Sequence, residues 1–526
     1  MTYITLGIGI FIFIGLTILF IVRNIKYGFR QTRNILIANV SIIAAVCVMF
    51  YFCFPYAANI IFFKTLYINF FNIFFSTVAI AIAWRGLKKN IEKRNKAMAI
   101  IFGLAAALCF ILGNGLLPRI TDSIIAEEYK FDKIDSLIEV NPKAIIFTPQ
   151  TVAYQDMIQN NASSEYTVAR DFTDPIDLDN GFGYISPIAP DGIIMTFNLK
   201  NSGFMVYNDN YNVHDNKRIE RVKEEFEIGE GMQWLDNVER SLYSLDRFCD
   251  YPEVHYLQID KNNKRNFIGV APKIKYRYSF PFFFIPYWGG VALIHSDGKI
   301  EELTPAEALA RKDLVKKWIY PKSLAKQIVE SQIYDQGFLS GLYQRPGKIQ
   351  VPELTGSDQM PYFFTAMDNT SYFMVATEPS GGSEALFRMY YINTHTGERS
   401  FLEWDVSNAI LGPKTSIQRV KQLEGRMWVE EQDNHEIGNF RIVQPIYLTK
   451  GQILYWKFTI TNREYVGVVS TVVVNAVTKQ IEEFNTREKF FCWLDQTLCE
   501  KQPTDEMQTF NSDSKHSKPT LQEVKA

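Results

Sequence analysis

Acidic residues are almost missing from the first 118 positions, where Glu92 stands alone against 11 lysines and arginines. The whole chain has 55 basic and 57 acidic residues, so 44 basic and 56 acidic residues remain for positions 119–526. An acidic part of this size is poorly suited to nucleic acid, whose phosphates need cationic groups around them. We therefore expect no nucleic acid among the partners.

Sequence motifs of the common enzyme classes are also missing. The chain has no HExxH or GxSxG motif, no Walker loop and no dinucleotide-binding glycine motif. Its histidines lack the spacing of a metal site on a helix. The sequence therefore predicts no recognisable catalytic residue, cofactor or metal site, and it favours a protein that is not an enzyme.

Two alternatives remain in the aspartate-rich region around positions 171–179. Catalytic carboxylates need no local motif, so an unrecognised hydrolase site stays open, with the candidates Asp171, Asp174, Asp177 and Asp179. The same stretch resembles the start of a calcium-binding loop, which makes Asp177 and Asp179 weak calcium candidates. The twelfth position from Asp177 is Ile188 rather than the glutamate of an EF-hand, so an Asp- and Asn-rich turn is the better interpretation.

Four long apolar stretches fill the N-terminal part and contain no charged side chain: Thr5–Val22, Ile35–Phe54, Leu66–Trp84 and Ala97–Leu117. A helix of roughly 20 residues crosses a hydrocarbon core of about 30 Å, which matches the length of these stretches. A cleaved signal peptide is disfavoured, because no basic segment precedes the first stretch. The sequence thus predicts a four-helix transmembrane domain over residues 1–118.

Basic residues gather in two of the connecting segments, residues 23–34 and 85–96. Such segments stay on the cytoplasmic side, so the prediction places the N-terminus and everything after position 118 outside the cytoplasm. The predicted location is the cytoplasmic (inner) membrane, with the lipid bilayer as one partner. The large C-terminal domain is expected on the extracytoplasmic side.

Three cysteines, Cys249, Cys492 and Cys499, would then face an oxidising compartment, which favours disulfides. In a continuous helix the Cα atoms of Cys492 and Cys499 would lie about 10 Å apart. That separation exceeds the limit of roughly 7 Å for a disulfide. A Cys492–Cys499 disulfide therefore requires a bend in the chain between them.

The part after position 118 shows a repeated order of elements. Residues 119–215 predict a juxtamembrane helix and an irregular β-rich region. A helix, three strands, a tight turn and a charged strand are then predicted three times, over residues 216–320, 321–412 and 413–500. The expected helices are Ile219–Phe248, Ser323–Tyr334 and Ser416–Leu423, and the expected turns are Ser296–Gly298, Thr394–Gly397 and Asn475–Lys479. Residues 501–526 are predicted to form a disordered tail.

Two local patterns refine this prediction. Thr304, Pro305 and Glu307 supply a capping hydroxyl, a first-turn proline and a glutamate able to bond back, so a helix should begin there. The aromatic run Tyr276–Trp288 is predicted as a buried strand that leads into the first turn, rather than as an exposed edge. The predicted fold class is a four-helix membrane domain joined to an extracytoplasmic α+β domain of repeated helix and antiparallel-sheet modules.

The second module carries a resemblance to a known family. Helix and strands followed by the turn Asn393-Thr394-His395-Thr396-Gly397-Glu398 are similar to the PepSY-type, cystatin-like module of exported and membrane-anchored bacterial proteins. Leu293–Lys299 matches more loosely, and the third turn lacks the glycine. The resemblance implies non-catalytic binding or inhibition in the cell envelope, sometimes directed at peptidases.

We therefore expect a membrane-anchored, non-catalytic binding or scaffolding protein of the cell envelope, with an envelope protein or the cell wall as partner. One alternative is an envelope hydrolase or peptidase regulator with an unrecognised carboxylate site. Another is a subunit of a membrane transport complex. That last alternative requires Asn69 and Asn72, on one face of the third predicted membrane helix, to line a water-filled path.

Overall fold

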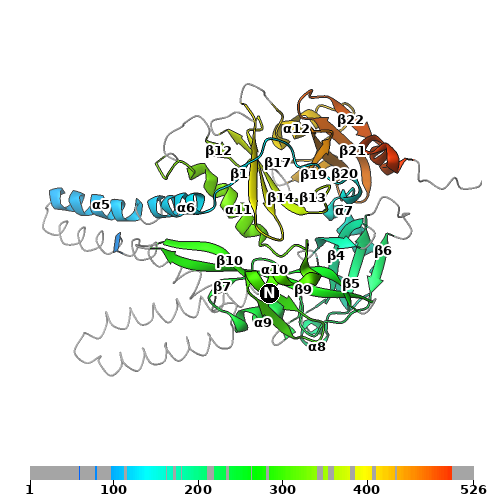
Figure 1. The fold of residues 1–526 in the computed structure, drawn as a ribbon, viewed down its shortest axis with the longest axis horizontal. Coiled ribbons are helices and arrows are strands. Elements are labelled where there is room, and N and C mark those ends of the chain that lie inside the picture. Colours follow the sequence, from blue (N-terminus) through cyan, green and yellow to red (C-terminus); the bar gives the residue numbers. More distant parts are fainter. Residues whose placement is uncertain are drawn as a thin grey trace, which may run out of the picture.

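The computed structural model describes residues 96–499 with short gaps, together with Asn59, Val78 and Ala79. The gaps are residues 112–114, 162, 170–172, 179–180, 193, 210–217, 233–235, 262–263, 280–282, 340–347, 353–359, 380–384, 406–409 and 433–434. Most of this part is β-structure, with short helices between mainly antiparallel sheets (Figure 1).

The prediction of a four-helix membrane domain is wrong for the described chain, in which no helix is both long and apolar enough to span a membrane. The first three predicted spans lie outside the described residues, except for Val78 and Ala79. The fourth corresponds to α5 (Lys96–Ile111), whose 16 residues rise only about 24 Å. The same finding overturns the prediction of a multi-pass inner-membrane location with both termini outside. The predicted tail, residues 501–526, also lies outside the described residues.

An N-terminal sheet follows α5, α6 (Leu117–Glu128) and a long connecting segment. Its strands run in the order β2-β4-β5-β6, with β3 also paired to β4. Its elements are α7 (Gln150–Gln159), β2 (Tyr166–Val168), β3 (Asp174–Leu178), β4 (Gly181–Pro190), α8 (Met195–Asn198), β5 (Phe204–Asn208) and β6 (Ile219–Val222). The helix predicted over Ile219–Phe248 is therefore wrong at its start, because edge pairing with β5 makes this segment β6.

Three modules follow, each with a helix before an antiparallel meander of four strands. The first has α9 (Val238–Leu245), β7 (Cys249–Asp250), β8 (His255–Lys261), β9 (Lys264–Ser279), β10 (Phe283–Ile294), β11 (Ile300–Leu303) and α10 (Pro305–Ala310). The second has α11 (Lys322–Ser331), β12 (Ile349–Gln350), β13 (Tyr362–Thr365), β14 (Ser371–Pro379), β15 (Arg388–Asn393) and β16 (Arg399–Glu403). The third has α12 (Pro413–Val420), β17 (Glu430–Gln432), β18 (His435–Ile437), β19 (Phe440–Lys450), β20 (Ile453–Asn462), β21 (Val468–Asn475), β22 (Ile481–Phe484) and α13 (Arg487–Leu494).

Each module ties its hairpin turn to the chain that leads into its helix. The carbonyl of one residue in each turn accepts a backbone N–H from that chain. Ser296 accepts from Glu227 at 3.0 Å, Thr394 accepts from Tyr320 at 2.8 Å, and Ala476 accepts from Leu411 at 2.9 Å. The same contact in three places fixes each helix against the end of its own meander.

The predicted helix start at Thr304 is confirmed by a capping box with Glu307. The aromatic run Tyr276–Trp288 is divided between two strands, β9 and β10, rather than forming one. Its residues 283–286 are buried, but Tyr278 is 49% exposed and Tyr287 is 39% exposed. The prediction of a single buried strand is thus wrong, because it overlooked the hairpin connection between them.

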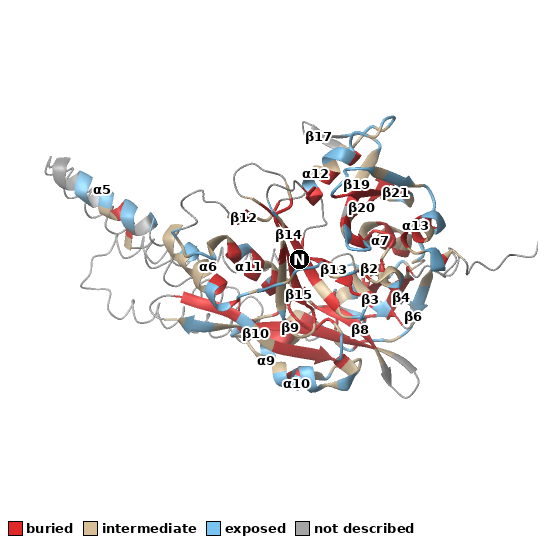
Figure 2. Ribbon diagram, turned by 45° about the horizontal axis from the view of Figure 1, so that its top comes forward, coloured by how far each residue is buried: buried red, intermediate tan, exposed pale blue. Residues whose placement is uncertain are grey.

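The core is shared across module boundaries. One cluster of buried side chains combines the second and third modules, as the contact of Phe364 with the ring of Tyr447 illustrates. A second cluster joins the N-terminal sheet to the first module, for example through Phe204 and Tyr256. Buried strands run through the centre of the molecule in Figure 2. The modules therefore pack as one body rather than as independent domains.

A segment that we call the strap, Tyr129–Thr148, runs over these units. Its Tyr129 hydroxyl donates to the carbonyl of Pro286 in the first module at 2.7 Å. Farther along, β1 (Asp132–Lys133) pairs in parallel with β16 of the second module. The Val140 amide then donates to Thr449 Oγ1 of the third module at 2.8 Å. One continuous stretch of chain thus bonds to every module.

Candidate functional site

The strongest concentration of unusual ionisable groups lies where the N-terminal sheet, the first module and α11 meet. We call it the Glu253 site and define it by five residues: Asp174, Glu230, Glu253, Tyr256 and Lys322. Asp174 begins β3, which lies against β8, and Glu253 precedes β8 by two residues. Lys322 is the first residue of α11. The site therefore depends on three units keeping their positions.

Glu253 caps the helix of the following module. Its Oε1 accepts the backbone N–H of Lys322 at 2.6 Å, and Pro321 before it offers no side-chain cap to α11. The first N–H groups of a helix lack partners within the helix and carry a partial positive charge. A carboxylate from another module is therefore a favourable partner for this end of α11.

Asp174 and Glu253 are half-buried, and the pKa of each carboxyl is raised above its ordinary value. Removal from water raises the pKa of Asp174 to about 7, against a lowering effect of the nearby Lys322 ammonium. Removal from water also raises the pKa of Glu253 to about 7, and the charge of Asp174 adds to this. Lys322 and its backbone N–H oppose the shift of Glu253. Both carboxyls therefore exchange protons near neutral pH.

Glu230 is more deeply placed, with only 1% of its surface exposed. The hydroxyl of Tyr256 donates to its Oε2, whereas its Oε1 has no hydrogen-bond partner. Burial raises the pKa of Glu230 to about 7, and the charge of Asp174 contributes. Gly231 has φ +74°, and a Cβ there would come within 2.6 Å of the Ala189 side chain. A glycine is thus required to carry Glu230 this close to β4.

His255 is a neutral residue two positions beyond Glu253, and its side chain lies on the face of β8 opposite to that of Tyr256. Its Nε2 lies 2.7 Å from the carbonyl oxygen of Trp318, and its ring stacks on the Trp318 ring with centroids 4.1 Å apart. Burial lowers the pKa of His255 to about 4. With Nε2–H donating to the carbonyl, the buried Nδ1 is an acceptor, and it has no partner.

The chemistry of the Glu253 site is that of hydrogen-bond acceptors and exchangeable protons. One buried acceptor atom of the site, Glu230 Oε1, lacks a donor. Carboxyl groups with a pKa near 7 can donate or accept protons at neutral pH. In the part of the chain that the structure describes, no three His, Cys, Asp or Glu side chains are placed to hold a metal ion.

Of the four aspartates singled out in the sequence, the structure brings only Asp174 into this site. Asp177 lies on the same strand and binds the Lys317 ammonium at 2.8 Å. Asp179, the other weak calcium candidate, and Asp171 lie outside the described residues. Sequence reasoning missed Glu230, Glu253 and Lys322. The glycines on both sides of Glu230 were the one local signal that could have drawn attention to it.

A second buried polar group, the Asp209 cluster, consists of Asp209, Lys457, Arg487 and Thr148. Asp209 Oδ1 accepts from Arg487 Nη1 and from Thr148 Oγ1, each at 2.8 Å. Its Oδ2 accepts the backbone N–H of Thr148 at 2.8 Å. Lys457 donates to the carbonyl of Phe147 at 2.7 Å. These bonds join the N-terminal sheet, the strap, β20 and α13.

Lys457 is completely buried. Removal from water lowers its pKa to about 7, with Asp209 opposing the shift and Arg487 adding to it. Its ammonium also lies 5.4 Å from the centre of the Phe147 ring. Because no part of Lys457 reaches solvent, this cluster is an internal joint and not a surface for a ligand.

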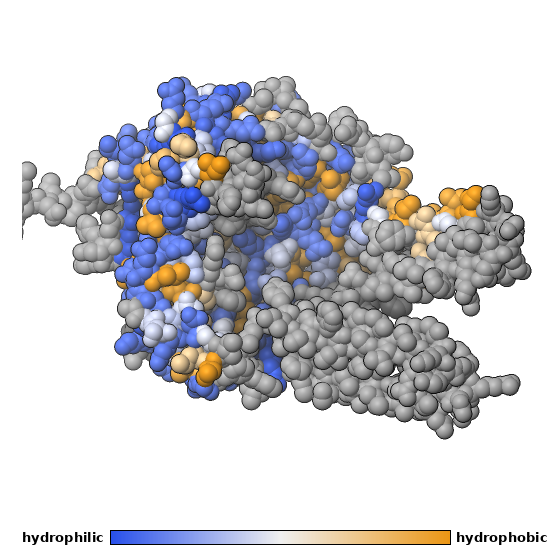
Figure 3. All heavy atoms as spheres, turned by 180° about the vertical axis from the view of Figure 1, so that it is seen from behind, coloured by the Kyte–Doolittle hydropathy of each residue, from blue (hydrophilic) through white to orange (hydrophobic). Residues whose placement is uncertain are grey.

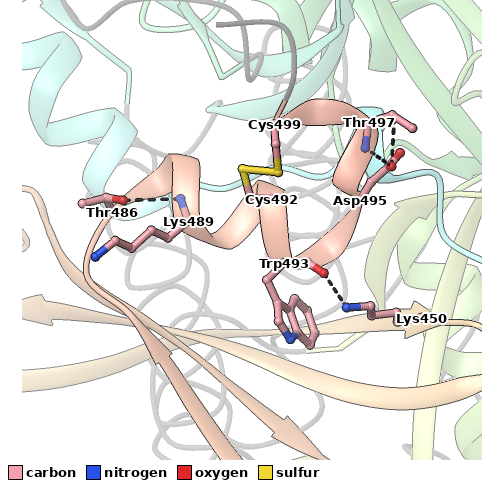
Figure 4. Close-up of a disulfide and its surroundings, with 8 residues drawn as sticks. All are labelled: Lys450, Thr486, Lys489, Cys492, Trp493, Asp495, Thr497 and Cys499. Carbon is pink, nitrogen blue, oxygen red and sulfur yellow. Dashed lines mark hydrogen bonds between the residues drawn. A yellow bond between two sulfur atoms is a disulfide. The ribbon is translucent and has the colours of Figure 1, made fainter.

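Three cysteines, Cys249, Cys492 and Cys499, lie in the described part of the chain with their side chains placed. Cys492 and Cys499 form a disulfide, with their Cα atoms 4.9 Å apart (Figure 4). The required bend is present, because α13 ends at Leu494 and a short 3₁₀ turn follows at Gln496–Leu498. Cys249 is a buried free thiol, and burial raises its pKa to about 12. It therefore lacks the thiolate character of a reactive cysteine.

Comparison with known proteins adds no family to this description. The chain matches no protein-family model, and no curated protein matches it. The assignment of function therefore rests on the geometry of the chain itself.

Proposed function

We propose that this chain is a non-catalytic binding protein, in which tandem modules form one rigid body that holds a protein partner. The observation that carries the proposal is the strap, which bonds in turn to the first, second and third modules. Rows of packed modules present extended surfaces, and proteins of that kind commonly bind other proteins.

The buried polar groups support the same function. The Asp209 cluster links segments 278 residues apart in sequence, and Glu253 of the first module caps a helix of the second. These groups are used to fix modules to one another. The resemblance to PepSY-type modules remains a prediction, and it implies the same class of function.

The surface is consistent with recognition through polar contacts. In Figure 3 the described part of the sheet body is mainly hydrophilic on the face shown, with hydrophobic side chains scattered over it. A non-obligate protein interface is about as apolar as the rest of the surface, so it needs no large hydrophobic patch.

Crosslinking in intact cells that produce the full chain, followed by mass spectrometry, tests this proposal. The wild-type chain should capture the same protein reproducibly. The Asp209→Ala variant should capture much less, because it loosens the joint between modules. Lys133→Ala, which removes only an exposed ion pair with Glu403, is the matched control. Equal capture by all three chains would contradict the need for a rigid body.

A second function, acid–base hydrolysis, is favoured by one observation: Asp174 and Glu253 are half-buried carboxyls with pKa values near 7. Such groups can act as a general acid and a general base. Assays of the purified chain with ester, glycoside and peptide substrates test it. Turnover that is lost in both Asp174→Asn and Glu253→Gln would establish this function in place of the first.

A further inference from the structure

The last strand of a meander can take up a further strand, as the second module already shows. β1 of the strap pairs in parallel with the outer edge of β16, where Asp132 lies opposite Ser400. Lys133 lies opposite Phe401, whose carbonyl accepts the backbone N–H of Ile134 at 2.9 Å. An edge strand offers such N–H and C=O groups to any strand that reaches it. The strap therefore occupies, within its own chain, a type of position that each meander possesses.

β22 is the equivalent strand of the third module. The Asn393 N–H donates to the carbonyl of Glu398, and β16 begins at the next residue. The Asn475 N–H donates to the carbonyl of Gln480, and β22 likewise begins at the next residue. The two strands therefore correspond position by position. In the described chain, however, no strand pairs with the outer edge of β22, at the rim of its sheet (Figure 1).

The backbone groups of Ile481 and Glu483 point away from the sheet. In an antiparallel ladder, residues that bond to the neighbouring strand alternate with residues that do not. Counting from the bonded residue Gln480, Ile481 and Glu483 turn their N–H and C=O groups outward. The same count in the second module turns Phe401 outward, which agrees with its bond to the strap.

This edge of β22 is open to solvent. Glu482 and Glu483 are exposed, whereas the corresponding residues of β16, 400–401, are half-buried beneath the strap. The side chain of Glu483 pairs with Arg426 and is only 27% exposed, so its main chain supplies much of the exposure of this residue. A further strand can therefore reach the main chain of β22.

The side chains of β22 indicate which strand would fit. Glu482 is exposed and forms no ion pair with another described residue. Pairing with the β22 of a second copy would bring like charges together, which is destabilising, whereas a basic side chain opposite Glu482 forms a favourable pair. On the same face, Phe484 is half-buried beside Trp493, with 5.4 Å between their ring centres. An apolar side chain fits next to these rings.

We propose that β22 accepts an extended segment of a partner protein as a fifth strand, with a lysine or arginine opposite Glu482 and an apolar residue two positions later. Main-chain bonds to Ile481 and Glu483 hold the segment, and its two side chains provide specificity. The segment runs parallel to β22, as β1 runs parallel to β16. This inference rests on the proposed function, because it identifies the surface by which the binding protein contacts its partner.

Fluorescence anisotropy of the full chain with labelled, blocked peptides tests the inference. The peptide Thr-Val-Lys-Thr-Val-Thr-Val carries a lysine and, two positions later, a valine. A second peptide has glutamate in place of the lysine. The wild-type chain should bind the lysine peptide at least tenfold more tightly than the glutamate peptide. Glu482→Lys should reverse this preference.

Two substitutions of Glu483 separate the main chain from the side chain. Glu483→Pro removes an outward N–H, and proline is tolerated in an edge strand where that N–H would face solvent. Glu483→Ala removes the same carboxylate but keeps the N–H, so it is the matched control. The proline variant should bind the lysine peptide at least tenfold more weakly than the alanine variant. Equal binding by the two variants overturns the inference.

Two further results would also overturn the inference. One is that the wild type binds neither peptide. The other is that the wild type forms a dimer that Glu483→Pro abolishes and Glu483→Ala does not, because a second copy would then occupy the edge. The urea midpoint shows whether Glu483→Pro is folded. If it is not, Glu482→Lys serves, and an unchanged peptide preference overturns the proposed strand.

Crosslinking in cells separates this inference from the proposed function. Glu483→Pro should capture much less of the cellular partner than Glu483→Ala does. If the two variants capture it equally while the wild-type chain still depends on its rigid body, the binding protein stands and β22 is not its point of contact. If the wild type captures no protein reproducibly, the proposed function itself fails.

Discussion

Asn393 and Asn475 hold the same position in successive modules and close their hairpins with the same hydrogen bonds. The side-chain oxygen of Asn393 accepts the backbone N–H of His395 and of Thr396. The side-chain oxygen of Asn475 accepts those of Val477 and Thr478 in the same way. The two modules therefore share a turn that asparagine specifies, although only the first of the two contains a glycine.

Replacing this asparagine should weaken the turn. Asn475→Ala removes two hydrogen bonds to backbone N–H groups and should lower the free energy of unfolding by about 1–2 kcal/mol. Urea unfolding followed by fluorescence measures the change. Asn475→Asp retains the acceptor and should lie close to wild type; a loss as large as that of the alanine variant would show that the side-chain oxygen is not what matters.

The Asp209 cluster should be far more sensitive than a surface ion pair. Asp209→Ala leaves Arg487 and Lys457 buried without their counter-charge, which typically costs about 3–5 kcal/mol. Lys133→Ala breaks an exposed pair with Glu403 and should cost about 1 kcal/mol or less. Urea midpoints of the two variants give the comparison, and similar midpoints would refute the structural role of the cluster.

Lys457 should make the protein more stable as the solution becomes alkaline. Its folded-state pKa is about 7, whereas an unfolded lysine titrates near about 10.4. The folded state therefore binds fewer protons than the unfolded state in this window, so stability rises with pH, by an amount on the order of 3 kcal/mol. Lys457→Met should flatten this rise in unfolding free energies measured between pH 7 and 9.5. An equally steep rise in the variant would assign it to other groups.

The carboxyls of the Glu253 site should make the protein less stable as the pH rises, which is the opposite of the effect of Lys457. The pKa values of Asp174, Glu230 and Glu253 are raised to about 7 in the folded state. The folded state therefore holds more protons than the unfolded state between about pH 4 and 7. Their contribution to stability is complete below this window and is lost as the pH rises through 7. Glu253→Gln should reduce that loss, and Asp177→Asn should leave the pH profile unchanged.

The disulfide should stabilise the end of α13. Cys499→Ser opens a short loop and should lower the free energy of unfolding by roughly 2 kcal/mol. Dithiothreitol should lower the melting temperature of the wild type but not that of the Cys499→Ser variant. Cys249→Ala is the control for effects of the reductant on the free thiol, and it should remain sensitive to the reductant.

Local signals in the sequence were enough to place much of the β-structure. The predicted turns Ser296–Gly298 and Thr394–Gly397 lie between the paired strands β10 and β11 and the paired strands β15 and β16. The helix predicted at Ser323–Tyr334 is found as α11 followed by a 3₁₀ turn. The predicted turn glycines Gly298 and Gly397 have positive φ angles, as tight turns require. These features depend on residues within a few positions of one another.

Features that depend on distant residues were not predictable in this way. The sequence predicts a helix that begins at Ile219, but pairing with β5 makes Ile219–Val222 an edge strand. The membrane prediction rested on the apolar stretches and the basic segments between them, and no helix among the described residues is both long and apolar enough to cross a membrane. Glu253 and Lys322 are separated by 69 positions, so no sequence spacing could have identified the Glu253 site.

The strap also affects the order in which the protein can fold. Val140 and Thr449 are 309 residues apart, and Phe147 and Lys457 are 310 apart. During synthesis Val140 of the strap therefore emerges 309 residues before its partner Thr449 in the third module. The strap's apolar side chains must remain uncovered during that interval, which exposes them to aggregation or chaperone binding. Slow contact formation across such separations should make docking of the strap a late step.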